Sequence, residues 1–210
     1  ELADLQPVMD RMLAKKRAPK QAFFASAGHG SPPLFGLCYR PAPLAKKVDR
    51  LGRVGLFCGP FSEPASIVAR LSAAVPGLVT APQDSAQLAA WLDGMALDVL
   101  VCAWDVPASA PALDAVATAH ATAGLWVLQA VLRARSKPRR LLWLTASATA
   151  LDEGSRIDPA PSTLWGLGRA AAQEHPELGL RLIDLHGLAQ PDELADLTRR
   201  LLDELAADDD

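Results

Sequence analysis

The sequence predicts a three-layer α/β sandwich, in which a parallel β-sheet carries helices on both faces. Short apolar runs alternate with longer helix-like stretches along most of the chain, which is the order of repeated β-α-β units. The run Val54–Cys58 is continuously apolar, as is typical of a strand buried on both faces of a parallel sheet. With 210 residues, 50% of them hydrophobic and 21% charged, the chain can form one domain with a sizeable core.

The first 30 residues differ from the rest of the chain. They place apolar residues at helical spacing ahead of a basic patch, Lys15–Arg17, which suits the C-terminus of a helix. The loop-forming stretch Gly28–Pro33 then marks a boundary, and His29 within it is expected to be a surface histidine. We therefore expect residues 1–30 to be a linker or the tail of a preceding domain, and residues 31–210 to be the α/β domain.

Proline- and glycine-rich turns separate the elements in the first half of the domain. Pro41 and Pro43 end the first strand, and the turn 59–64 follows the second. Asp84 or Ser85 is suited to cap the helix that begins there. In chain order, this half is predicted to contain strands at 34–39, 54–58, 77–80 and 97–103, and helices at 65–74 and 85–92.

The second half continues the alternation with longer helices. An alanine-rich stretch predicts a helix of roughly 24 residues, about 36 Å long at about 1.5 Å per residue. The next helix lies between Pro161 and Pro176, because proline is tolerated in a first helical turn but not in a helix interior. This half is predicted to contain helices at 112–135, 161–175 and 192–206, and strands at 141–145 and 180–185.

Basic residues gather where the long helix is predicted to end. We expect them to complement the negative end of the helix dipole, and an anion-binding site is the alternative. The residues concerned are Arg133, Arg135, Lys137, Arg139 and Arg140.

Composition argues against several classes of function. The formal net charge is -3, so no global field favours nucleic acid or anionic lipid. No uninterrupted apolar run reaches the roughly 18 residues of a membrane span, and no signal peptide opens the sequence. Cys38, Cys58 and Cys102 lie far apart without a CxxC motif, which predicts free thiols in a reducing, cytoplasmic setting. We expect no nucleic-acid partner and no membrane.

The signatures of a dinucleotide-dependent reductase are missing. The turn after Val54–Cys58 keeps only Gly59 of a glycine-rich phosphate loop, and Pro60 and Pro64 remove two N–H donors. The single tyrosine, Tyr39, heads no Tyr-x-x-x-Lys pair that could deliver a proton to an alkoxide. No histidine pair has metal-ligand spacing. We therefore expect no catalytic residue, no cofactor-binding residue and no metal site.

The stretch Ser162–Leu185 carries the most specific pattern in the sequence. Its run Leu164-Trp-Gly-Leu-Gly-Arg169 closely resembles the non-catalytic, structural half of the ketoreductase of modular type I polyketide synthases, or a pseudo-ketoreductase of that family. In that family a short-chain-dehydrogenase-like fold occurs twice, and only the second copy binds NADPH and reduces. Trp165 and Arg169 stand at the spacing of the catalytic pair, but neither an indole nor a guanidinium can exchange a proton near neutral pH.

The resemblance implies a truncated Rossmann-like domain that binds no cofactor itself and holds the NADPH-dependent catalytic half. The helices at 112–135 and 161–175 would then face the partner, and we expect possible partner contacts at Trp126, Trp165, Gly168 and Arg169. A neighbouring methyltransferase, enoylreductase or dehydratase domain is the other partner that the resemblance allows. Two further hypotheses stay open: the chain could be a divergent reductase with an unrecognised site, or a protein-interaction module.

Overall fold

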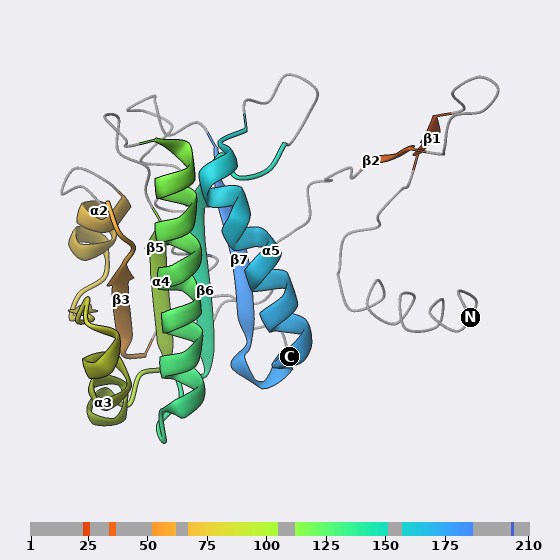
Figure 1. The fold of residues 1–210 in the computed structure, drawn as a ribbon. Coiled ribbons are helices and arrows are strands. Elements are labelled where there is room, and N and C mark those ends of the chain that lie inside the picture. The colour runs from red at the N-terminus through yellow and green to blue at the C-terminus, as the bar shows by residue number, and fades with distance from the viewer. Residues whose placement is uncertain are drawn as a thin grey trace.

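A computed structural model describes residues 23–25, 34–36, 52–61, 67–104, 112–150, 157–186 and 203. Its main body is a five-stranded, wholly parallel sheet in the order β4-β3-β5-β6-β7 (Figure 1). The predicted parallel sheet is therefore confirmed. The strands are β3 (Val54–Cys58), β4 (Val79–Thr80), β5 (Val99–Trp104), β6 (Arg140–Ala146) and β7 (Leu180–Leu185).

The sheet is wound in two directions from its centre. The chain passes from β3 outward to β4, returns across β3, and then continues through β5, β6 and β7 to the opposite edge. Helices make each of these crossovers, as parallel strands require. The helices are α2 (Ile67–Ala74), α3 (Ser85–Met95), α4 (Leu113–Arg133) and α5 (Pro159–Glu174), with a 3-10 turn, η2 (Pro176–Leu178), before β7.

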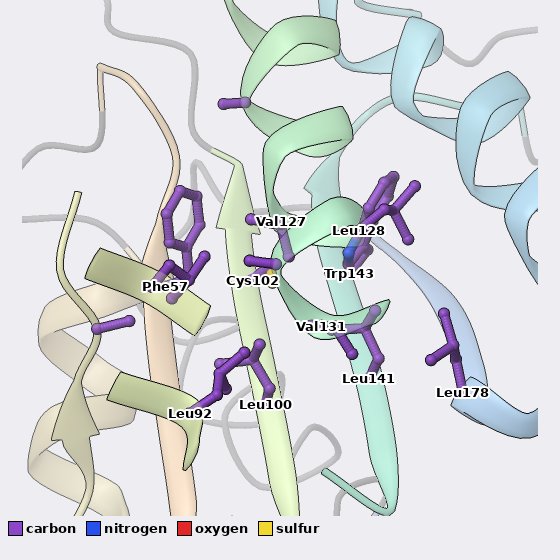
Figure 2. Packing of buried hydrophobic residues seen from close by; sticks show 14 of the residues in the cluster. Phe57, Leu92, Leu100, Cys102, Val127, Leu128, Val131, Leu141, Trp143 and Leu178 are labelled. Atoms are coloured by element: carbon purple, nitrogen blue, oxygen red, sulfur yellow. The ribbon is translucent and has the colours of Figure 1, made fainter. Parts of the chain in front are cut away.

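Helices cover both faces of the sheet, which confirms the predicted three layers. On one face, α3, α4 and α5 pack on the sheet around Leu100, Cys102 and Trp143 (Figure 2). On the other face, Leu71 of α2 packs with strand residues such as Val101. Both cores are apolar throughout, so burial of these side chains is the main force that holds the layers together.

Local capping sets the ends of the helices. The Asp84 carboxylate accepts a hydrogen bond from Ala86 N at 2.7 Å and so caps α3, as the sequence predicted. Helix α5 begins at Pro159 rather than at Pro161, because the Asp158 carboxylate caps it by accepting from Ala160 N at 3.0 Å. Pro159 then occupies the first turn, where its missing N–H costs nothing.

A second, smaller sheet lies in the N-terminal part. Strand β1 (Phe23–Ala25) pairs antiparallel with β2 (Leu34–Gly36). Of these, only the strand that starts at residue 34 was predicted, and the hairpin joins residues on both sides of the boundary predicted at residue 30. Most of the segment 1–30 and most of the helix predicted at 192–206 lie outside the described residues.

Helix α4 is long and apolar enough to cross a membrane by length and composition alone. No uninterrupted apolar run had suggested this. In the structure, however, one side of α4 is buried in the core, where Val127 and Val131 are wholly covered. Packing on the sheet therefore accounts for the apolar character of the helix.

Candidate functional site

The carboxyl ends of β3 and β5 form the place where an open α/β sheet binds its ligands, because the chain reverses direction between these two strands. The turn after β3 should cradle phosphate if the fold held a dinucleotide. Here Gly59 N instead donates to Ala103 O at 2.7 Å. A Cβ at Gly59 would lie 2.6 Å from Cε3 of Trp104. The glycine therefore makes room for an indole of this chain.

Aromatic rings fill the space at this edge of the sheet. The ring centroids of Trp104 and His120 lie 6.0 Å apart, and that of Phe61 lies 6.2 Å from His120. Phe57 and Trp143 contact the same indole at 5.8 Å and 5.5 Å between centroids. Trp104 and His120 have no exposed surface. We call this cluster the aromatic plug: Phe57, Phe61, Trp104, His120 and Trp143.

The aromatic plug lies beside the turn after β3, and the sequence did not indicate it. The sequence pointed to Pro60 and Pro64 as obstacles to phosphate binding, whereas in the structure Trp104 and His120 are also buried near this turn. Phe61 holds a positive φ of 73°, a conformation that is unusual for a bulky residue, with its ring beside His120. A large residue at the carboxyl end of a buried strand was the available signal, but the sequence did not show that Trp104 would lie against Gly59.

Trp165 begins a chain of side-chain contacts that runs through Thr145 to Asp184. The indole Nε1 of Trp165 donates to Thr145 Oγ1 at 2.9 Å, and Thr145 Oγ1 donates to Asp184 Oδ1 at 2.8 Å. The Arg169 guanidinium lies over the Trp165 ring, with Cζ 5.3 Å from the centroid. The Trp165 indole and the Thr145 hydroxyl are both engaged in these hydrogen bonds.

Asp184, which sequence reasoning missed, is the centre of this network. Its side chain is only 5% exposed, and His186 Nε2 lies 2.9 Å from Oδ2. Ala148 N donates to Oδ1 at 2.9 Å, while Thr149 donates twice to Oδ2, from its amide at 2.8 Å and its hydroxyl at 2.9 Å. An acidic residue next to the last residue of β7 was the available signal. Its carboxylate ties the loop after β6 to the end of β7.

The same loop is fixed by backbone and hydroxyl contacts. Ser147, in a left-handed conformation with a φ of 53°, donates its amide to Leu185 O at 3.0 Å. The Ser147 carbonyl accepts from Asp158 N at 2.7 Å. The Ser162 hydroxyl lies 2.6 Å from Ala148 O and 2.8 Å from Asp158 O, so it can donate to either carbonyl. The Ser147 backbone and the Ser162 hydroxyl therefore help to fix the loop after β6.

Metal and thiolate chemistry find no support among the residues that the structure describes. No group of three or more His, Cys, Asp or Glu side chains is placed there to hold a metal ion. Neither Cys58 nor Cys102 forms a disulfide. Burial raises the pKa of Cys102 well above its ordinary value, so this thiol stays protonated. His29, Cys38 and Tyr39 lie outside the described residues.

The predicted partner contacts divide into exposed and buried residues. Trp126 is 45% exposed on α4, and Arg169 is exposed on α5. Trp165 is partly covered through its bond to Thr145. Gly168 is buried, and a Cβ there would lie 2.5 Å from Leu182 Cδ2 of β7. Gly168 therefore faces the sheet rather than a partner, because β7 packs directly on that side of α5, and its predicted place on the partner surface is wrong.

A family model described as polyketide synthase extender module SpnB, Rossmann fold domain, matches residues 58–209. One of the subunits of the phenolphthiocerol/phthiocerol polyketide synthase of Mycobacterium tuberculosis is 34% identical over 128 residues, which are 60% of this chain and 8% of that protein. Polyketide synthase GfsA of Streptomyces halstedii is 45% identical over 75 residues, 33% of this chain and 1% of that protein. The chain thus spans less than a tenth of either relative.

Solved structures give the same fold. An A-type ketoreductase from a modular polyketide synthase superposes with a TM-score of 0.57 at 24% identity, over 76% of this chain and 36% of that one. The first ketoreductase of the tylosin PKS gives a TM-score of 0.54 at 24% identity, over 78% of this chain and 35% of that one. A C2-type ketoreductase from a modular polyketide synthase gives a TM-score of 0.51 at 26% identity, over 75% of this chain and 37% of that one. The chain thus spans about a third of each of these structures.

Proposed function

Because the chain belongs to the Rossmann fold domain family of polyketide synthase extender modules, we propose that it is a non-catalytic scaffold of a modular polyketide synthase. It stabilises and orients an NADPH-dependent ketoreductase catalytic half during polyketide chain assembly, and it binds no NADPH itself. The observation that carries the proposal is the aromatic plug, which lies at the crevice between β3 and β5 where a dinucleotide would bind.

Opening that crevice would be costly. Trp104 and His120 are wholly buried, and Trp104 touches Phe57 and Trp143 as well. Removing a large aromatic side chain from a core costs about 3–5 kcal/mol, and displacing one into water while leaving its cavity carries a penalty of that order. Such a penalty weakens an affinity by more than a hundredfold, since about 1.4 kcal/mol corresponds to a factor of ten.

The chemistry at the neighbouring strand ends supports the same proposal. A reductase needs a phenol whose pKa is lowered by a nearby lysine. In this chain the corresponding helix offers Trp165 and Arg169, which bind Thr145 and each other. Thr145 is in turn committed to Asp184. These side chains stabilise the scaffold, so reduction belongs to the partner half.

The outer face of α4 and α5 is where we place the partner. These helices lie side by side over one face of the sheet (Figure 1). Leu125 and Trp126 of α4 are each 45% exposed, and Gly166, Arg169 and Ala170 of α5 are also exposed. An exposed tryptophan is one of the residues that most often anchor protein–protein contacts.

The test is to express the catalytic half of the same synthase with and without this chain, and to measure its reduction of a β-ketoacyl thioester with NADPH. We expect the catalytic half to gain activity and thermal stability when the chain is present. Trp126→Ser should weaken the association by roughly thirtyfold, since an aromatic hot spot contributes about 2 kcal/mol. Ile157→Ser changes a similarly exposed apolar residue, 47% exposed, and serves as the control. Full activity of the catalytic half alone would refute the proposal, as would reduction by this chain alone.

A further inference from the structure

The turn that joins α4 to β6 carries an alternating pattern of exposed cations. Arg133, Arg135, Lys137 and Arg139 are exposed. Two small residues between them, Ala134 and Pro138, are buried. We call residues 133–139 the basic turn. No acidic residue interrupts it, although the whole chain has a net charge of -3.

Hydrogen bonds hold the backbone of the basic turn in place. Ala134 N donates to Ala130 O at 2.9 Å, which closes the last turn of α4. The Asp93 carboxylate, at the end of α3, accepts from Arg135 N at 2.6 Å and from Ser136 N at 3.0 Å. The backbone is therefore fixed while the basic side chains stay in solvent, so a partner that binds them loses little free energy to ordering of the turn.

The helix dipole explains only part of this charge. Its effect is confined to the last helical turn, and Arg133 is the basic residue that α4 places there. The pKa of Glu177 is lowered chiefly by a backbone hydrogen bond, and the charge of the nearby Lys137 lowers it further. No ion pair within the described parts of the chain engages the side chains of Arg133, Arg135 or Arg139. Among the described residues, these three guanidinium groups thus have no carboxylate partner.

The basic turn lies at the opposite end of the sheet from the aromatic plug. It immediately precedes the start of β6, whereas the plug lies at the carboxyl ends of the parallel strands (Figure 1). We propose that the basic turn is a docking surface for an acidic protein segment, such as a helix that carries carboxylates on one face. This inference is independent of the scaffold role.

Charge complementarity favours an acidic protein over a nucleic acid. Asp93 and Glu177 flank the basic turn, and the chain as a whole is negative, so a long phosphate backbone would meet repulsion beyond a short footprint. A helix with a few carboxylates fits a short footprint, and guanidinium groups bind carboxylates through two parallel hydrogen bonds. The attraction should raise the association rate and weaken with salt.

The experiment measures binding of the full chain to three labelled probes by fluorescence anisotropy. The probes are an alanine-rich helical peptide with a glutamate on every turn, its glutamine counterpart, and a single-stranded DNA of similar length. We expect binding of the glutamate peptide only, and its loss at about 1 M salt, where the Debye length is about 3 Å. Equal binding of both peptides, or tighter binding of the DNA, would overturn the proposal.

Variants separate the basic turn from charge in general. The triple change Arg133→Gln, Arg135→Gln and Arg139→Gln should weaken peptide binding by about threefold to about a hundredfold, since each exposed ion pair contributes a factor of about 1.4 to about 5. Arg169→Gln removes an exposed arginine of α5 and should leave binding nearly unchanged. Circular dichroism confirms that each variant is folded. Unchanged affinity in the triple variant, or an equal loss in the Arg169 variant, would contradict the proposal.

Discussion

Replacing Asp184 by asparagine tests whether its carboxylate holds the end of the sheet together. The change keeps the size of the side chain and replaces one acceptor oxygen with an NH₂ group. Thr145, Ala148 and Thr149 supply four hydrogen bonds to the two oxygens of the buried carboxylate. If the new amide oxygen faces Thr145 and Ala148, its NH₂ group faces the two donors of Thr149.

The expected cost follows from those contacts. A buried donor left without an acceptor costs about 1–3 kcal/mol, and hydrogen bonds to a charged group contribute about 1.5–3 kcal/mol each. Allowing for rotation of the Thr149 hydroxyl, we expect Asp184→Asn to lower the free energy of unfolding by about 3 kcal/mol. Asp114→Asn is the control, because Asp114 is exposed in the first turn of α4 and should cost less than about 1 kcal/mol.

Urea unfolding followed by circular dichroism measures both variants. The double variant Asp184→Asn with Thr149→Val should lose less than the sum of the single losses, because the two side chains share a hydrogen bond. If Asp184→Asn matched Asp114→Asn in stability, the carboxylate network would not be what fixes the loop after β6, and the reasoning would be wrong.

Three further predictions concern packing, thiol reactivity and pH. Gly168→Ala should destabilise the protein by about 1–3 kcal/mol, because its Cβ would press on Leu182, whereas Gly166→Ala, which has open space, should stabilise it by up to about 1 kcal/mol in the same urea assay. Cys102 should react with a thiol reagent only on unfolding, because burial raises its pKa; rapid labelling of the native protein would contradict this. The pKa of Glu177 is lowered, chiefly by a backbone hydrogen bond and further by His175 and Lys137. The ionised Glu177 carboxylate therefore stabilises the fold at pH values above the ordinary pKa of 4.5, and this stabilisation is lost as the pH falls through the lowered pKa. The stability difference between Glu177→Gln and the unaltered protein should therefore shrink in acid, and a difference that grew there would count against the assignment.

The order and type of the main elements followed from the sequence, because local signals determine them. Continuous apolar runs such as Val54–Cys58 are compatible with a buried parallel strand, and Asp84 can cap a helix wherever that helix packs. The departure from a glycine-rich phosphate loop was equally visible in Pro60 and Pro64. These features depend on a few neighbouring residues, so one sequence is enough to recognise them.

The contents of the crevice and the carboxylate network depend on contacts between distant parts of the chain. Trp104 reaches Gly59 because β3 and β5 pair in a register that aligns Cys58 with Ala103. Asp184 meets Thr145 because the two are register partners on β7 and β6. Gly168 was placed on the wrong face of α5 for the same reason, since only the packing of α5 on β7 decides which face is buried.

Titration of the full chain with NADPH, followed by the fluorescence of the nicotinamide, tests most directly whether the aromatic plug excludes a dinucleotide. An intact ketoreductase that binds NADPH provides the positive control. We expect no saturable binding up to millimolar NADPH, because Trp104 and His120 occupy the crevice. Saturable binding in the micromolar range would show that the crevice opens and would contradict the scaffold role.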